Sequence, residues 1–271
     1  MMPSLRSIFS TDYRCEHPPY TAHLVSHSPL VIYIKNFITP AERAHLLKLG
    51  NGTFTRSGVT TSSSRSSSNN NPHNHNHGQP ATAHNHPVRT SQSTTLPPSD
   101  PVVSCIETRA LLFQSPGTPR SHLEPLQLVR YAPGEHYHFH TDWFTAPGAH
   151  AGADRGGNRR TSFFVYVRVE EGTLGGGTNF PRLRIGWWCE QGIVDCDAEW
   201  EAGVTFRPVE GNAVFWANLI EGEEDGLGGG GGGRRGDERT LHAGLPVLAG
   251  GKVGMNIWTR EGPVGEGIRG G

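Results

Sequence analysis

The sequence lacks the features that mark several large classes of protein. It has no surplus of charge, since 24 Lys and Arg balance 25 Asp and Glu for a formal net charge of −1. This balance gives no indication of a nucleic-acid groove or of an anionic membrane surface as partner. No run approaches the ~18 apolar residues of a membrane-spanning helix, and residues 1–20 lack the apolar segment of a secretory signal. We therefore expect a cytoplasmic or nuclear protein without a nucleic-acid partner.

Cysteine is also scarce. The four cysteines, Cys15, Cys105, Cys189 and Cys196, are too few and too scattered for a disulfide framework, and none forms a CxxC pair. We expect reduced thiols. A bridge between Cys189 and Cys196 stays open as an alternative. It would matter only in an oxidising compartment.

Two segments lack the apolar residues that a core needs. Residues 57–98 are rich in Ser, Asn, Pro and His and contain five of the fifteen histidines. Such a stretch buries too little apolar surface to offset the entropy of ordering it, so we expect a disordered insertion here. Residues 226–236, which begin GLGGGGGG, are expected to form a flexible loop. A linker role is favoured over loose metal binding by the histidines, because a tract of this kind has no rigid support for its ligands.

The remainder predicts one domain over residues 29–260, after an N-terminal extension (1–28) and before a short tail (261–271). Near its start, LVIYI at 30–34 has strand composition. Thr39, Pro40 and Glu42 then stand at the N-cap, N1 and N3 positions of a helix that Gly50 ends. A second helix is expected over residues 101–113, where apolar residues recur at helical spacing.

From residue 126 to residue 258 the pattern changes to short β-rich runs. They are LQLVRY, YHFHTDWF, TSFFVYVRVE, GVTFRPV, NAVFWANL and KVGMNIWT. Turn sequences such as APGE, GTLGGG and LPVLAGG separate them. Frequent turns between short strands favour an antiparallel sandwich or barrel over a parallel sheet with crossover helices. The expected fold is mainly β (α+β), a jelly roll with flanking N-terminal helices.

The run HYHFHTDWF, at 136–144, contains a candidate metal site. On a strand, residues two apart face the same way, so His136, His138, His140 and Asp142 would share one face. A polar solvent face would give the same pattern, and the geometry alone leaves open which histidine binds. The candidates for a further ligand outside the insertion are His122, His150 and His242.

Six motifs resemble those of the catalytic domain of prolyl 4-hydroxylases, in the same order. They are Tyr131-x2-Gly134-x2-Tyr137-x2-His140-x-Asp142, Arg159-x3-FFVYV, GGGTNFP at 175–181, GNAVFW at 211–216, HAGLPV at 242–247, and Lys252. The resemblance covers residues 29–260 apart from the insertion. It is strongest to the small single-domain type of fungi and other microbes. These enzymes have a double-stranded β-helix, which is the jelly-roll core expected here.

The resemblance implies an Fe(II)- and 2-oxoglutarate-dependent dioxygenase that hydroxylates a peptidyl proline. His140, Asp142 and His242 would be the iron ligands, a 2-His-1-carboxylate triad that leaves positions open on the metal. The co-substrates would be 2-oxoglutarate and O2, the coproducts succinate and CO2, and ascorbate a further cofactor. By this match His136 and His138 are rim or solvent residues.

The resemblance also implies a binding site for 2-oxoglutarate. Lys252, ten residues after the third ligand, would hold the remote carboxylate, although a lysine in a β-rich run is ordinarily a solvated residue. Tyr131 would hydrogen-bond the same carboxylate, and the competing interpretation is a core tyrosine. Thr178 is a third candidate contact, with a plain strand-start residue as its alternative.

Two more residues of the matching region have candidate roles around the site. Trp258 would lie at the substrate mouth, although most of the six tryptophans must be core residues. Arg159 would order a loop over the site, with a surface salt bridge as the alternative.

Other functions stay open beside the peptidyl-proline enzyme. The same chemistry could act on free proline, another side chain or a small metabolite, because the triad and Lys252 fit each of them. A cupin-like scaffold without turnover is the alternative from a different class. The family resemblance also offers the endoplasmic reticulum as a compartment, and exposed edges of a jelly roll are compatible with a dimer.

Overall fold

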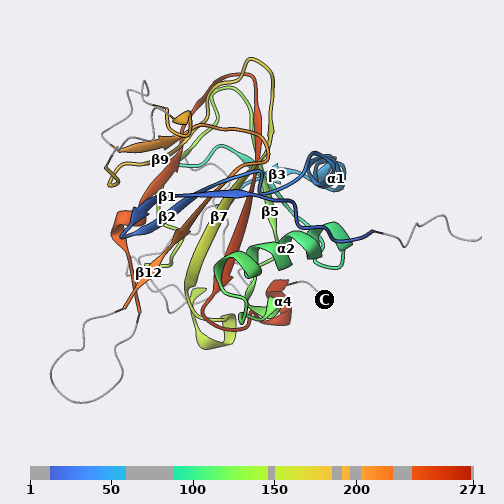
Figure 1. Ribbon diagram of the computed structural model, residues 1–271, viewed down its shortest axis with the longest axis vertical. Helices are drawn as coiled ribbons and strands as arrows, with labels where there is room; N and C mark the ends of the chain where they lie inside the picture. The colour runs from blue at the N-terminus through green and yellow to red at the C-terminus, as the bar shows by residue number, and fades with distance from the viewer. Residues whose placement is uncertain are drawn as a thin grey trace, which may run out of the picture.

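The computed structural model describes residues 13–58, 88–145, 150–184, 191–195, 203–221 and 234–269. Its β-rich runs form two antiparallel sheets (Figure 1). An eight-stranded sheet has the order β1-β2-β11-β7-β16-β5-β4-β3, and a four-stranded sheet has the order β10-β9-β14-β6. The mainly β jelly roll with flanking helices that the sequence predicts is confirmed.

The strands are short, as the spacing of the turns in the sequence predicts. The large sheet contains β1 (Thr21–His27), β2 (Leu30–Lys35), β11 (Ala213–Ala217), β7 (Arg159–Val169), β16 (Lys252–Arg260), β5 (Gln127–Tyr131), β4 (Gln92–Thr95) and β3 (Thr55–Arg56). The small sheet contains β10 (Val204–Phe206), β9 (Thr178–Phe180), β14 (His242–Gly244) and β6 (Tyr137–His140). Two further pairs join β12 (Leu219–Ile220) to β13 (Arg235–Gly236) and β15 (Val247–Ala249) to β8 (Leu174–Gly175).

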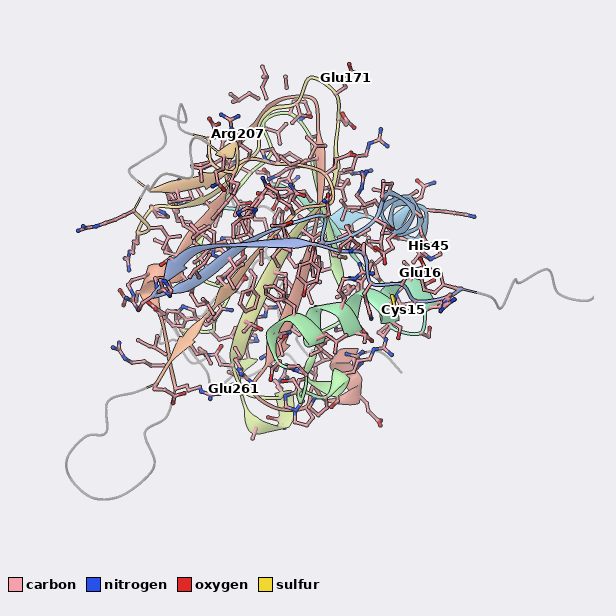
Figure 2. All side chains as sticks on the ribbon, in the orientation of Figure 1. Cys15, Glu16, His45, Glu171, Arg207 and Glu261 are labelled. Carbon is pink, nitrogen blue, oxygen red and sulfur yellow. A yellow bond between two sulfur atoms is a disulfide. The ribbon has the colours of Figure 1, made fainter. Side chains whose placement is uncertain are left out.

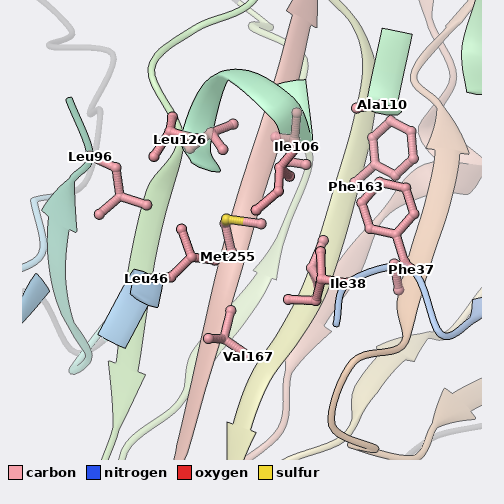
Figure 3. Close-up of a cluster of buried hydrophobic side chains, with 14 of the residues drawn as sticks. Phe37, Ile38, Leu46, Leu96, Ile106, Ala110, Leu126, Phe163, Val167 and Met255 are labelled. Atoms are coloured by element: carbon pink, nitrogen blue, oxygen red, sulfur yellow. The ribbon is translucent and has the colours of Figure 1, made fainter. Parts of the chain in front are cut away.

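Strand β7 separates two hydrophobic cores, because its side chains alternate between the faces of the large sheet. Phe163, Val165 and Val167 join the cluster that packs under the helices, part of which Figure 3 shows. Phe164 and Tyr166 join a second cluster, which combines residues of both sheets. The chain thus builds one core for stability and a second that surrounds the interior of the barrel.

Two helices, α1 (Pro40–Gly50) and α2 (Pro101–Gln114), contribute to the first core. At α1 the Thr39 side chain accepts from the Glu42 amide, and the Glu42 carboxylate accepts from the Thr39 amide, so the predicted capping box is confirmed. At α2 the cap is Asp100, whose side chain accepts from two amides of the first turn. A short helix, α4 (Glu266–Arg269), follows the last strand.

Some residues outside the predicted domain core are part of the large sheet. Strand β1 lies within the expected N-terminal extension and pairs with β2. Strand β4 lies within the expected insertion and pairs with β5, and its Gln, Ser and Thr side chains are half-buried or exposed. Polar strands of this kind carry no apolar alternation, which is why composition placed them in linkers. Residues 59–87 of the predicted insertion and 226–233 of the predicted glycine loop lie outside the described residues.

Cys15 and Cys105 form a disulfide, so the expectation of reduced thiols is wrong for this pair. Their Cα atoms are 5.4 Å apart although 90 positions separate them in sequence. The bond holds the N-terminal segment against α2, and Figure 2 shows Cys15 and Glu16 beside this helix. The spacing of the cysteines in the sequence could not reveal the pair, because the two residues come together only when α2 packs against the N-terminal segment. Cys189 and Cys196 lie outside the described residues.

A buried ion pair lies next to the disulfide. Arg109, on α2 and 1% exposed, donates to the two carboxylate oxygens of Glu42 at 2.9 and 2.6 Å. It also donates to the backbone carbonyls of Phe37 and Glu16, at 2.9 and 2.7 Å. Bidentate geometry with further acceptors is what a buried guanidinium needs to offset its desolvation. The N-terminal segment therefore supplies one of the acceptors for a charge inside the fold.

We predict that Cys15→Ser lowers the thermal stability of the protein. Loss of a native disulfide typically costs about 2–5 kcal/mol, and here it also frees the Glu16 carbonyl from Arg109. The measurement is the Tm by calorimetry, with and without dithiothreitol. Reductant should lower the Tm of the parent protein towards that of the variant and leave the variant unchanged. An unchanged parent Tm, with no Cys15–Cys105 peptide in non-reducing mass spectrometry, would contradict the bond.

Candidate active site

Pairing of β6 with β14 brings three predicted ligands to one point. His140, the last residue of β6, lies opposite His242, the first residue of β14. Asp142 stands in the bend just beyond β6. Its Oδ1 lies 3.8 Å from His140 Nε2 and 3.9 Å from His242 Nε2. One ligand atom from each of the three side chains lies within 4.8 Å of the others, close enough to share a metal ion.

Backbone carbonyls fix the orientation of both imidazoles. His140 Nδ1 donates to the His138 carbonyl at 2.8 Å, and His242 Nδ1 donates to the Thr240 carbonyl at 2.9 Å. With Nδ1 protonated and held in this way, each Nε2 keeps its lone pair for a metal. Phe180 stacks on the His242 ring with centroids 5.3 Å apart, which further restricts that side chain.

Electrostatics keep His140 and Asp142 in the ionisation states that metal binding requires. Burial, reinforced by the nearby His242, lowers the pKa of His140 to about 3, so this ring is neutral at pH 7. Burial alone would raise the pKa of Asp142, but the imidazoles of His242 and His140 and the Arg159 guanidinium outweigh it. The pKa of the Asp142 carboxyl therefore lies below its usual range. A neutral imidazole and a carboxylate are the forms that coordinate metals.

A network of buried charges surrounds Asp142. Trp258 Nε1 donates to Asp142 Oδ2 at 2.9 Å, and Arg159 lies over the Trp258 ring, with its guanidinium carbon 3.6 Å from the ring centroid. Arg159 forms two hydrogen bonds of 2.8 Å with the Glu124 carboxylate, which also accepts from Arg260. Arg159 is thus in a largely buried ion pair, with its side chain 16% exposed, and not in the surface salt bridge that was its alternative. The predicted role of Trp258 at the substrate mouth stays a prediction.

Lys252 occupies the interior of the barrel on β16. Its side chain is 1% exposed, and its Nζ donates to the Gly176 carbonyl. The Nζ also lies 4.6 Å from the ring centroid of Tyr131 and 5.4 Å from that of Phe164. Among the described residues it forms no ion pair with a carboxylate, and burial lowers the pKa of Lys252 to about 7. A buried ammonium of this kind fits the anionic end of a ligand.

The other two residues predicted to bind the co-substrate are also buried. Tyr131 is 3% exposed, and burial raises the pKa of its hydroxyl to about 12, so it remains a donor at neutral pH. Thr178 is 3% exposed, and its Oγ1 lies 2.8 Å from the Tyr166 hydroxyl. Gly176, at φ +70, allows the backbone to pass within van der Waals contact of the Lys252 side chain. The GGGT motif therefore packs directly against the lysine.

These residues fit Fe(II) and 2-oxoglutarate. Two imidazoles and one carboxylate in a cluster form the donor set that Fe(II) oxygenases use, with positions left open on the metal. The Lys252 ammonium, inside the same barrel, supplies the charge that a dicarboxylate needs. The remaining histidines of the opening motif are not part of the cluster. His138 is exposed, and His136 Nδ1 lies 3.4 Å from the Gly134 carbonyl.

Sequence reasoning missed a second buried cation near the triad. Arg89 is 8% exposed and bridges to Tyr137, over whose ring its guanidinium carbon lies at 4.5 Å. Tyr137 in turn stacks on the His140 ring, with centroids 3.6 Å apart. Arg89 Nε donates to Ser91 Oγ at 3.1 Å, while its buried NH2 group has no partner among the described residues. The only signal was an arginine in a tract nearly free of large apolar side chains, and the low-complexity composition masked it.

Comparisons with known sequences identify relatives of this chain. The sequence model of the 2OG-Fe(II) oxygenase superfamily matches residues 126–260. Prolyl 4-hydroxylase 1 of Arabidopsis thaliana is 26% identical over 242 residues, which cover 88% of this chain and 71% of the relative. Prolyl 4-hydroxylase subunit alpha-1 of Gallus gallus is 32% identical over 186 residues, which cover 68% of this chain and 29% of the relative.

Two solved structures share the fold. The viral collagen prolyl hydroxylase of Paramecium Bursaria Chlorella virus-1, in complex with 2OG, superposes with a TM-score of 0.51 at 22% identity, over 85% of this chain and 95% of that chain. A prolyl hydroxylase of Trichoplax adhaerens was solved in complex with a peptide fragment of the hypoxia inducible factor oxygen degradation domain. It superposes with a TM-score of 0.50 at 13% identity, over 85% of this chain and 83% of that chain. At these identities the likeness supports the jelly-roll architecture.

We predict that the affinity for 2-oxoglutarate falls as pH rises through the pKa of Lys252. Burial lowers that pKa to about 7 in the free protein, and a bound carboxylate raises it again, so binding takes up a proton. Above this pKa the dissociation constant should rise by up to about tenfold per pH unit. It is measured by calorimetry on Zn(II)-loaded protein at several pH values, in buffers of different ionisation enthalpy.

Lys252→Arg is the matched variant for this titration. A guanidinium stays charged throughout the range, so the variant should bind with an affinity that no longer depends on pH through this group. A parent protein whose affinity is flat from about pH 6 to 9 would show that Lys252 is already charged when the site is empty.

Proposed function

We propose that this chain, which belongs to the 2OG-Fe(II) oxygenase superfamily, hydroxylates a prolyl residue within a peptide or protein. It is a 2-oxoglutarate-dependent dioxygenase that uses Fe(II), 2-oxoglutarate and O2. His140, Asp142 and His242 are the proposed iron ligands. The observation that carries the proposal is the cluster of these three side chains in a fold that also buries Lys252. Relatives named prolyl 4-hydroxylases, aligned over most of the chain, support the substrate class.

The reaction requires each group to be held in place by this chain. When bound, the iron couples the oxidative decarboxylation of 2-oxoglutarate, to succinate and CO2, with insertion of the second oxygen atom of O2 into a substrate C–H bond. The carbonyls of His138 and Thr240 orient the two imidazoles, and Trp258 fixes one oxygen of Asp142. Such supporting contacts keep a metal site within the tolerance that the chemistry requires.

Lys252 and Tyr131 hold the co-substrate in this proposal. The lysine ammonium pairs with the remote carboxylate, and the Tyr131 hydroxyl, which stays protonated, donates to it. Both side chains project from adjacent strands, since Lys252 lies opposite Tyr131 in the pairing of β16 with β5. The apolar walls from Phe164 and the second core keep water away from this charge pair and so strengthen it.

Aromatic and guanidinium groups beside the triad suit a prolyl peptide. Tyr137 stacks on His140, and Phe144 lies against both Arg159 and Arg260. A pyrrolidine ring packs well on aromatic faces, so the half-buried rings of Tyr137 and Phe144 support a prolyl substrate.

An oxidising compartment, such as the endoplasmic reticulum, is the proposed location. The Cys15–Cys105 disulfide supports it over the cytoplasm or nucleus, because such bonds persist in oxidising compartments. Among the helices that the structure describes, none has the length and apolar character needed to span a membrane.

The test is turnover by the full chain, purified without oxygen and reconstituted with Fe(II). Succinate is quantified after addition of 2-oxoglutarate, O2 and ascorbate, with and without proline-rich peptides, and peptide masses are followed for a gain of one oxygen. We expect succinate that rises with a proline peptide and an added oxygen on proline. The His242→Ala protein, which lacks one ligand, should lose both signals by several orders of magnitude.

Two results would redirect the proposal. Succinate formation that no peptide stimulates, but that free proline or another small molecule does, would transfer the same chemistry to that substrate. A folded, iron-loaded protein without any succinate would leave a binding scaffold. Replacing proline by alanine in the best peptide is the matched substrate control, and it should remove the added oxygen.

A further inference from the structure

Asp142 is the ligand whose position the sheet does not fix. Strand β6 ends at His140, and Asp142 lies in the bend that follows. His140 and His242, in contrast, are register partners in the pairing of β6 with β14. The position of the carboxylate therefore depends on side-chain contacts around the bend. Trp258 donates to one carboxylate oxygen of Asp142. Trp143, the residue that follows Asp142, anchors the bend through its indole ring.

The ring of Trp143 lies directly on Gly236, the last residue of β13. A Cβ atom at position 236 would fall 2.1 to 2.3 Å from three ring atoms of Trp143, namely Cδ2, Cε3 and Cε2. No side chain other than hydrogen fits in this contact. Trp143 Nε1 also donates to the Asp237 carbonyl at 3.2 Å. The bend is thus attached to the segment that leads into the third ligand.

Asp237 is the buried centre of that segment. Its carbonyl accepts from Thr240 Oγ1 at 2.7 Å as well as from Trp143. Its carboxylate receives the Arg239 guanidinium at 2.7 and 2.9 Å, and its amide donates to the Asn218 carbonyl at 2.8 Å. Thr240 is the residue whose carbonyl orients His242. A continuous series of contacts therefore runs from the bend of Asp142 to the imidazole of His242.

We infer that Trp143 is a positioning residue that sets the separation of Asp142 from His242, through its contact with Gly236 and Asp237. This rests on the proposed metal site. The indole holds the bend that carries Asp142, and the absence of a side chain at Gly236 lets strand β13, which pairs with β12, approach the ring. This contact acts on the affinity for the metal, because the ligands must lie within about 0.5 Å of their bound positions.

The test is a double-mutant cycle on metal affinity. Gly236→Ala places a methyl group within the space of the indole, and Trp143→Ala removes the indole. Each should weaken binding of Mn(II), measured by electron paramagnetic resonance as a stand-in for Fe(II), by about tenfold or more. In the double variant the methyl group meets no ring, so adding Gly236→Ala to Trp143→Ala should cost less than about twofold.

Two further variants separate positioning from folding. Gly117→Ala is the matched control, since a Cβ there meets nothing within 4 Å, and it should leave Mn(II) affinity unchanged. Trp143→Phe keeps an aromatic ring on Gly236 but loses the hydrogen bond to Asp237, and it should show an intermediate loss. All affinities are measured well below the Tm of each variant, where a purely structural role would not change the affinity of the folded protein.

The outcomes distinguish this inference from the function it rests on. If the parent protein binds Mn(II) and His242→Ala does not, the metal site stands. Single Trp143 variants that then bind within twofold of the parent overturn the inference alone. A Gly236→Ala substitution that costs equally with and without the indole overturns it as well. A parent protein that binds no Mn(II) overturns the proposed metal site itself.

Discussion

The site depends on one register, the antiparallel pairing that places His242 opposite His140. Side chains on a strand alternate between faces, so a slip by one residue would turn one imidazole away from the other. The strands of the small sheet are only three or four residues long. Side chains from neighbouring strands therefore help to fix the register. Phe180 on β9 and Trp216 on β11 pack against His242, with ring centroids 5.3 and 4.7 Å away. Packing in the second core thus holds His242 in the position from which it can bind a metal.

The buried charged side chains have two kinds of environment, with and without a partner of opposite charge. Glu42 with Arg109, and Glu124 with Arg159 and Arg260, are paired through short hydrogen bonds that satisfy several of their atoms. Such pairs give definite geometry and little net stability. Lys252, within the described part of the chain, contacts a carbonyl and aromatic rings instead. The paired charges have a structural role. The Lys252 ammonium, which has no carboxylate partner among the described residues, can instead pair with the carboxylate of a ligand.

Local sequence signals predicted those parts of the molecule that depend on local physics. The capping box of α1 follows from Thr39 and Glu42, which interact within one turn. The resemblance to prolyl 4-hydroxylases proposed the triad, whereas strand alternation alone could not distinguish His138 from His140. Two classes of feature escaped. Arg89 and β4 lie in a polar tract without periodicity, and the pairing of Cys15 with Cys105 depends on how α2 packs. Trp143 escaped for a related reason, since its partner, Gly236, lies 93 positions away in a glycine-rich segment.

The disulfide also changes the covalent topology of the chain. Cys15 and Cys105 enclose everything between them in one closed loop, including β1, β2, α1 and residues 59–87. A protease that cuts once anywhere in this loop leaves two fragments that remain joined through sulfur. When the cut falls within residues 59–87, β1 and β2 lie in the N-terminal piece, and the triad lies entirely in the other piece. Such a cut therefore leaves the first strands of the large sheet covalently joined to the half of the chain that carries the triad.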